Sequence, residues 1–189
     1  EADAGRRPRR VRAWSAACST GEEPYTIAMS LLQAFPPTLG WSVDVLGTDL
    51  STRVLERARQ ATWPIAKAAE IPPHLLKRFM LRGTGAAEGR MKAGPELQAV
   101  VRLARLNLNA DAYGAVGQFD LVFCRNVLIY FDPATKARVL ERLLDHLAPN
   151  GLLFLGHAES LGAGTGRLRA VIPSVYAFAD ADAPARRAS

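Results

Sequence analysis

Small residues stand where the first apolar run of this chain ends, and they could form part of a ligand site. Residues 11–17 have the length of a strand, residues 18–21 (CSTG) predict a tight turn, and an amphipathic helix follows. Gly21 would let the backbone approach a cofactor closely, at a helix N-terminus with unpaired N–H groups. The same stretch also fits an ordinary helix capped by Ser19 or Thr20, in a box with a glutamate of the first turn.

An acidic residue stands at the end of the next expected strand, residues 41–48 (WSVDVLGT). A Rossmann-like fold holds ribose hydroxyls with a carboxylate at this place, so Asp49 is a candidate for cofactor binding. The alternative is that Asp49 only helps to cap the helix that begins at Ser51.

Two polar residues, Arg125 and Asn126, follow the apolar run 121–124, which has the pattern of a strand buried on both faces. Polar residues at the carboxyl end of such a strand indicate a site. The alternative for Arg125 is an ion pair with Asp120 or Asp132.

The sequence gives little support for metal-dependent catalysis or for a serine nucleophile, and we expect no metal. His74, His146 and His157 are too scattered for one metal site, and no G-x-S-x-G elbow provides a serine nucleophile. Residues 156–160 (GHAES) place His157 and Glu159 just past an apolar run, where they could line a cleft or simply begin a loop.

The elements that must position these residues alternate as strand and helix. After the strand at 41–48, strands are expected at 98–108, 120–124, 151–156 and 175–179, the last of them antiparallel. A strong amphipathic helix starts at Asp132-Pro133 and ends at residues 149–151. The fold class is therefore α/β, with a mostly parallel sheet and helices on both faces. Glycines and prolines between short segments predict an inserted antiparallel β-subdomain at about 79–100.

Composition indicates a single globular domain. The chain has 189 residues, 49% of them hydrophobic, which is enough to bury one core. No apolar run has the length of a membrane span, and residues 1–10 have no apolar signal-peptide segment. Cys18 and Cys124 fit no metal-ligand spacing and suggest reduced thiols, so we expect a cytoplasmic protein.

The net charge of +6 is concentrated at the ends of the chain. Arginines stand at positions 6, 7, 9, 10, 12, 186 and 187, and without them the balance is close to neutral. No aromatic residues interleave with these clusters, so we expect no nucleic-acid partner. The first residues are either a solvated arm or a surface for an anionic partner. We expect a basic arm or linker at 1–10, one domain at 11–180 and a tail at 181–189.

Several stretches together resemble the CheR-type chemotaxis receptor methyltransferases. They are residues 14–25 (WSAACSTGEEPY), 47–49 (GTD), 107–108 (NL), 119–120 (FD) with 123–131 (FCRNVLIYF), and 151–157 (GLLFLGH). Their order and spacing are also similar over about residues 11–179. The longest stretches are too long for chance to be a good explanation.

The resemblance implies a Rossmann-like class I methyltransferase fold that binds S-adenosylmethionine without a metal. Besides Gly21, the residues that it assigns to the cofactor are Glu23, Asp49, Asn107, Leu108, Arg125 and Asn126. It places Tyr130 beside the reacting methyl, so Tyr130 and Arg125 are the candidates for orienting the reactants. A carboxylate that is ionised at neutral pH is already nucleophilic, so positioning must supply the rate.

The implied reaction is methylation of glutamate side chains on the cytoplasmic helices of chemoreceptors, giving glutamyl methyl esters and S-adenosylhomocysteine. We expect a monomer without membrane insertion. Residues 82–90, from Arg82 to Arg90, resemble the insertion of family members that dock on a peptide at the receptor's C-terminal tail. The alternatives are a non-catalytic sensor of S-adenosylmethionine or its product, and a nucleic-acid or small-molecule methyltransferase.

One feature of the family pattern is not matched at the start of this chain. The family normally carries a small helical domain and a T-N-x-T-x-F-F-R segment that helps to close the cofactor site, whereas this chain begins with an arginine-rich lead. We expect a methyltransferase domain that was cut from a longer protein or naturally has no lid. Cofactor binding should then survive better than turnover.

Overall fold

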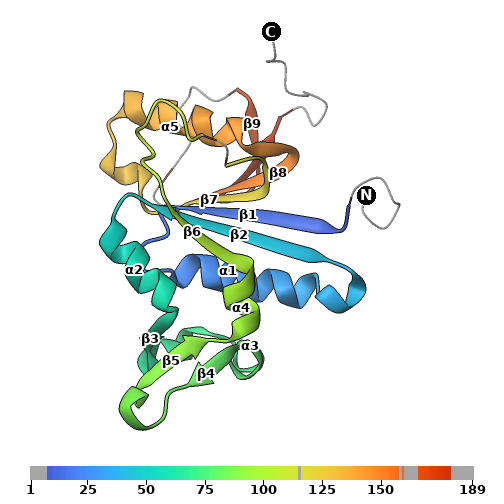
Figure 1. The fold of residues 1–189 in the computed structure, drawn as a ribbon. Coiled ribbons are helices and arrows are strands. Elements are labelled where there is room, and N and C mark those ends of the chain that lie inside the picture. Colours follow the sequence, from blue (N-terminus) through green and yellow to red (C-terminus); the bar gives the residue numbers. More distant parts are fainter. Residues whose placement is uncertain (1–7, 115, 158, 160–165, 180–189) are drawn as a thin grey trace.

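The main sheet positions the residues discussed above. The computed structural model describes residues 8–114, 116–157, 159 and 166–179, and these residues form a seven-stranded sheet with helices on both faces (Figure 1). Its strands are β1 (Arg10–Ala16), β2 (Ser42–Asp49), β6 (Val101–Arg105), β7 (Phe119–Cys124), β8 (Leu147–Leu155), β9 (Leu168–Ile172) and β10 (Val175–Phe178). Their order is β6-β2-β1-β7-β8-β10-β9.

The central strands are parallel and buried. Trp14 of β1 lies opposite Leu46 of β2 and Val122 of β7, and β10 runs antiparallel to both of its neighbours. The strand order turns around at β1, which has β2 on one side and β7 on the other. Open α/β sheets bind ligands in the crevice at the carboxyl ends of such strands. The fold therefore brings the ends of β1, β2 and β7 to one edge.

Helices α1 (Glu22–Ala34), α2 (Thr52–Gln60) and α4 (Pro95–Val100) lie on one side of the sheet, and α5 (Pro133–Asp145) lies on the other (Figure 1). The 3-10 turns are η1 (Pro37–Leu39), η2 (Ile65–Glu70), η3 (Gly85–Ala87) and η4 (Leu128–Tyr130). As expected, α5 starts after Asp132, which accepts a hydrogen bond from Thr135 N at 2.9 Å. None of the helices in the described residues is long and apolar enough to cross a membrane.

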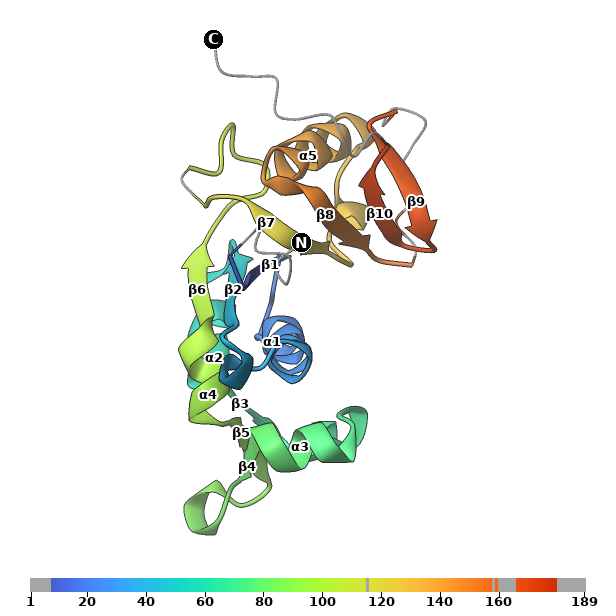
Figure 2. The ribbon, with the colours of Figure 1, turned by 90° about the vertical axis from the view of Figure 1, so that its right-hand side faces the viewer.

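A small antiparallel sheet stands apart from the main sheet, as the glycine and proline pattern predicted (Figures 1 and 2). Its order is β3-β5-β4, with β3 (Thr62–Pro64), β4 (Met80–Arg82) and β5 (Arg90–Ala93), and α3 (Pro73–Phe79) leads into β4. The first strand, β3, precedes the expected range. It is anchored by Trp63, whose buried ring lies 5.1 Å from the ring of Tyr25 on α1, centroid to centroid.

Two expected boundaries are wrong, and one strand was not expected. Residues 98–100 complete α4, and β6 begins only at Val101, because Gly94-Pro95 starts a helix whose short apolar pattern resembles that of a strand. Helix α5 ends at Asp145, and β8 already runs through residues 149–151. Strand β9 was not expected, because most of its side chains are exposed and the pattern of a buried strand is therefore missing.

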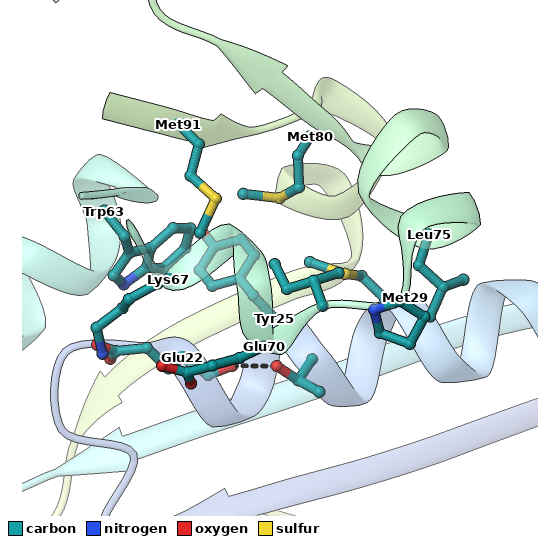
Figure 3. Close-up of a pocket in the computed structure, with 12 residues that line it drawn as sticks. Glu22, Tyr25, Met29, Trp63, Lys67, Glu70, Leu75, Met80 and Met91 are labelled. Atoms are coloured by element: carbon teal, nitrogen blue, oxygen red, sulfur yellow. Dashed lines mark hydrogen bonds and ion pairs between the residues drawn. The ribbon is translucent and has the colours of Figure 1, made fainter. Parts of the chain in front are cut away.

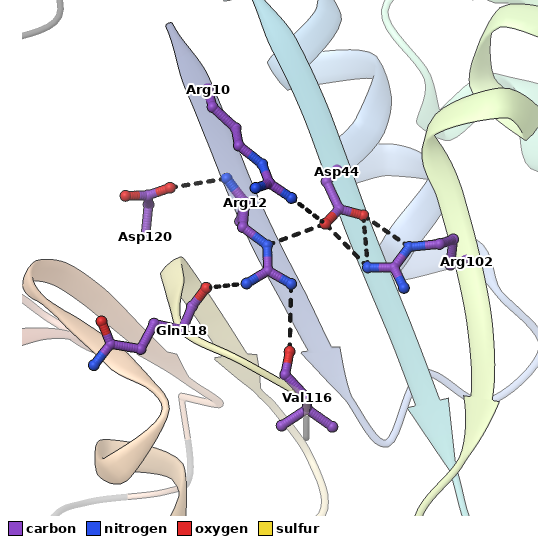
Figure 4. A network of polar contacts seen from close by, with 7 residues as sticks. All are labelled: Arg10, Arg12, Asp44, Arg102, Val116, Gln118 and Asp120. Atoms are coloured by element: carbon purple, nitrogen blue, oxygen red, sulfur yellow. Dashed lines mark hydrogen bonds and ion pairs between the residues drawn. The ribbon is translucent and has the colours of Figure 1, made fainter. Parts of the chain in front are cut away.

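Arg10 and Arg12, both in β1, help to hold neighbouring strands together. Arg10, Arg12 and Arg102 surround the Asp44 carboxylate, with Nε of Arg12 and Nε of Arg102 each 3.0 Å from it (Figure 4). Partial burial alone raises the pKa of Asp44, but the hydrogen bonds from Arg102 and Arg12 outweigh it and hold that pKa below its ordinary value. The arginines at positions 6 and 7 lie outside the described residues.

Candidate active site

The turn between β1 and α1 depends on Gly21. Gly21 is the N-cap of α1 with φ of 94°, and no side chain caps this helix, so the expected capping box is wrong. Thr20 Oγ1 donates instead to Glu22 Oε2 at 2.6 Å. A Cβ at Gly21 would lie only 2.9 Å from the Cβ of Ala58. Glycine therefore permits both the left-handed turn and the close approach of α2 to it.

The Asp49 carboxylate joins the ends of β1 and β2. Its Oδ2 accepts a hydrogen bond from Ser19 N and its Oδ1 accepts one from Ser51 N, both at 2.9 Å, and Ser51 caps α2. A carboxylate has about four lone-pair sites, so each oxygen keeps one for a ligand hydroxyl. Asp49 thus supports the start of α2, which was the alternative role considered from the sequence. Its remaining lone pairs still fit the two hydroxyls of a ribose.

The segment after β6 lies beside Asp49. Leu106 N donates to the Asp49 carbonyl oxygen at 3.0 Å, which places Asn107 and Leu108 next to the end of β2. The Asn107 side chain is exposed and accepts a hydrogen bond from Asn109 N at 2.9 Å, whereas Leu108 is buried. The structure therefore brings together the candidates at the ends of β2 and β6.

Arg125 pairs with Glu23, and not with either aspartate considered from the sequence. Arg125 Nη1 lies 3.4 Å from Glu23 Oε2, and Ser15 Oγ donates to Glu23 Oε1 at 2.7 Å. Burial raises the pKa of Glu23, and the hydrogen bonds from Ser15 and Arg125 only partly offset this. Asp120 and Asp132 accept backbone N–H groups elsewhere. The ion pair links the first turn of α1 to the end of β7.

The turn after β7 carries Asn126 and Tyr130. Asn126 has a left-handed φ of 59°, and Tyr130, at the end of η4, is 79% exposed. Glu159 accepts backbone N–H groups of this turn and is only 3% exposed, whereas His157 is exposed. The sequence left open whether Glu159 lines a cleft or only begins a loop, because its one signal was a charged residue shortly after a buried strand.

Two cavities flank the first turns of α1. A cavity of about 220 Å³ separates α1 from the small sheet, and an ion pair of 2.6 Å between Glu22 and Lys67 lies at its polar end (Figure 3). Its apolar lining includes Tyr25, Met29, Trp63, Leu75, Met80 and Met91. A groove of about 430 Å³ lies beside Glu23 and Arg125 and includes Leu121 and Phe123 of β7. Open space thus adjoins the Glu23–Arg125 pair.

Neither cysteine offers a reactive thiol. Both are buried and unpaired by disulfides, and burial, with the charge of Asp49, raises the pKa of Cys18 to about 12. Burial also raises the pKa of Cys124, so both thiols stay protonated at neutral pH. Across the described residues, no group of three or more histidine, cysteine or acidic side chains could hold a metal ion.

These features define the class of protein. The strand order with its antiparallel β10, the glycine turn after β1 and the carboxylate that ends β2 are those of a class I S-adenosylmethionine-dependent methyltransferase fold, as expected from the sequence. The residues present fit that cofactor, because each oxygen of Asp49 keeps an acceptor site for a ribose hydroxyl, and Gly21 has no side chain of its own to keep a ligand away from the turn.

Comparison with known proteins identifies the family. Residues 1–176 match the family described as CheR methyltransferase, SAM binding domain, and the chain belongs to this family. It is 42% identical over 174 residues to chemotaxis protein methyltransferase 2 of Pseudomonas aeruginosa, covering 90% of this chain and 60% of that protein. It is 43% identical over 176 residues to the chemotaxis protein methyltransferase of Escherichia coli, covering 93% and 61%.

The chain therefore spans about three-fifths of the length of these curated relatives. Among solved structures, PKMT2 from Rickettsia typhi in complex with AdoHcy aligns with 77% of this chain and 20% of that chain. That alignment has 20% identity and a TM-score of 0.48.

Proposed function

We propose that this chain is the cofactor-binding, methyl-transferring domain of a protein-glutamate O-methyltransferase that acts on chemoreceptors. Its substrates would be glutamate side chains on the cytoplasmic helices of the receptors, and its products glutamyl methyl esters and S-adenosylhomocysteine. The observation that carries the proposal is the match of residues 1–176 to the CheR methyltransferase SAM-binding domain. The names of the relatives, chemotaxis protein methyltransferases, support the substrate class.

The cofactor is held, in this proposal, along the edge where β1, β2, β6 and β7 end. Asp49 accepts the ribose hydroxyls with the lone pairs that Ser19 and Ser51 leave open. The turn at Gly21 lets the backbone come close to the cofactor. The remaining cofactor contacts are Glu23, Asn107, Leu108, Arg125 and Asn126.

The chemistry requires positioning rather than proton transfer. When bound, S-adenosylmethionine supplies a methyl group on a positively charged sulfur, which an ionised glutamate can accept without first losing a proton. Arg125 is the group that we assign to orienting the incoming carboxylate, because its side chain is 42% exposed and its guanidinium donates only one hydrogen bond to Glu23. Tyr130 presents an exposed hydroxyl that can orient either reactant.

A transfer assay tests the proposal. The chain is incubated with methyl-labelled cofactor and receptor-bearing membranes, and in parallel with RNA. We expect label on the receptor that mild alkali releases, as a carboxyl methyl ester requires. Base-stable label on RNA would instead identify a nucleic-acid methyltransferase. Cofactor binding with no label on any acceptor would identify a sensor if it is also found when the chain is joined to the family's N-terminal helical domain, because this chain alone is expected to keep binding better than turnover.

We also propose that the small sheet binds a short peptide at the receptor's C-terminal tail, through residues 82–90. Strand β4 is an edge of this sheet, so an extended peptide can pair with its outer backbone groups. Gly85 and Gly89 have φ of 56° and 77°, and a Cβ on either would meet no heavy atom within 4 Å. Residues 84–90 are all exposed, which supports a loop that is available to a partner. Exposed Arg82 can meet an acidic residue of the peptide.

Such a tether would raise the local receptor concentration to about the millimolar range without changing the active site. Titration of tail peptides against the chain, and against a variant with residues 83–89 replaced by a plain turn, tests this. We expect binding to the first only. Equal binding by both, or by neither, would end the tether proposal.

The proposed substrate places the protein in the cytoplasm, since the receptor helices that carry the glutamates are cytoplasmic. The free thiols of Cys18 and Cys124 agree with a reducing compartment. We propose a monomer that binds no nucleic acid. Sedimentation of the purified chain, alone and with RNA, tests both statements.

A further inference from the structure

Glu159 is a buried carboxylate whose hydrogen-bond partners in the described residues are backbone N–H groups. Oε1 accepts hydrogen bonds from Val127 N at 2.9 Å and Leu128 N at 2.7 Å. Oε2 accepts them from Asn126 N at 3.0 Å and Gly156 N at 2.7 Å. The residue is 3% exposed. One side chain therefore joins the turn after β7 to the end of β8.

The donors match an ionised carboxylate in number. A carboxylate has about four lone-pair sites and no donor, and four N–H groups point at this one. Consecutive N–H groups that converge on one anion form a nest, which favours negative charge. An amide of the same shape would turn its NH2 group toward N–H donors and leave some of them unpaired in a buried place.

Glu159 contacts a turn with an uncommon backbone conformation. Asn126 adopts a left-handed φ of 59°, which asparagine tolerates better than most residues other than glycine. The packing also requires Gly156, since a Cβ there would lie 2.6 Å from Glu159 Oε2 and 3.0 Å from Asn126 N. The turn begins at Arg125 and continues into η4, which ends at Tyr130. Its conformation thus sets where both side chains point.

We infer that Glu159 is a positioning residue of the methyltransferase site. Its carboxylate holds residues 126–128 in the conformation that presents Arg125, Asn126 and Tyr130 to cofactor and substrate. This rests on the proposed function for the roles of those three residues. The competing role is purely structural, because Leu128 is buried beneath the same turn and Glu159 could serve only to keep it there.

Glu159→Gln in the 189-residue chain separates the two roles. We expect backbone amides 126–128 to exchange with deuterium at least tenfold faster, while amides of β7 keep their protection. We also expect the Kd for S-adenosylhomocysteine, measured by calorimetry on folded protein, to rise at least tenfold. A purely structural role would lower the melting temperature and leave that Kd unchanged. The matched control is Glu141→Gln on α5, which breaks an exposed ion pair with Arg167 and should alter neither quantity.

Affinity within twofold of wild type, or unaltered exchange at residues 126–128, would overturn the inference. If Glu159→Gln does not fold, Glu159→Asp takes its place and is judged by the same two measurements, since it keeps the charge but is one methylene too short to reach all four donors. If the wild-type chain itself does not bind S-adenosylhomocysteine, the proposed function fails instead. The exchange rates then decide alone whether Glu159 orders the turn.

Discussion

Replacing Asp49 with alanine should weaken both the fold and cofactor binding, and the two losses can be measured separately. The carboxylate accepts hydrogen bonds from Ser19 N and Ser51 N, each at 2.9 Å. Asp49 is partly exposed, so water can replace much of what is lost. At about 1 kcal/mol per bond, the free energy of unfolding should fall by about 2 kcal/mol.

Cofactor binding should lose more. Hydrogen bonds to a charged acceptor contribute about 1.5–3 kcal/mol, which corresponds to a fall of about 10- to 150-fold in affinity for S-adenosylhomocysteine at 25 °C. Calorimetry well below the melting temperature measures the affinity, and urea unfolding measures the stability. Glu56→Ala on the exposed face of α2 is the matched control, and it should change each free energy by about 0.5 kcal/mol or less.

The two measurements can refute the reasoning in different ways. Unchanged affinity with a loss of stability would leave Asp49 as a support for the turn and for α2 only. Unchanged stability would show that the two backbone hydrogen bonds to Asp49 contribute nothing to the free energy of unfolding, although both have a distance of 2.9 Å. Lost affinity with unchanged stability would show that Asp49 serves only in binding the cofactor.

Three further outcomes are expected. Asp44→Asn should destabilise the chain by about 1–3 kcal/mol at pH 7. Because the folded pKa of Asp44 is lowered, this deficit should persist above the ordinary aspartate pKa of about 3.9 and vanish as pH falls through the folded pKa, which urea unfolding over a series of pH values from 7 into the acid range checks. Tyr130→Phe should lower turnover while the affinity for S-adenosylhomocysteine stays the same, and full turnover would remove Tyr130 from the mechanism. Cys18, with a pKa of about 12, should resist thiol reagents at neutral pH in the folded chain and react after unfolding in urea; fast labelling of the folded chain would contradict its burial.

Local sequence patterns predict much of the fold. Apolar runs, turn residues and the Asp132 cap each act within a few residues, so they place β1, β2, β7 and α5 without knowledge of the rest of the chain. Where a local pattern fits both a helix and a strand, or has no buried face, it does not predict the element correctly. Residues 98–100 were assigned to a strand because an apolar run so short has no distinct period, and β9 has no buried face to reveal it.

In the candidate site, too, some features follow from local sequence and others only from the tertiary structure. The sequence by itself determined that Asp49 and Arg125 end buried strands, and parallel strands place such ends on one edge. Only the tertiary structure decided their partners, because these depend on which strands become neighbours. Arg125 pairs with Glu23, 102 positions away, and the Glu159 carboxylate reaches amides 31 to 33 positions away. A pattern read along the chain records which side chains need a partner, but the partner is chosen by distances that exist only once β7 lies between β1 and β8.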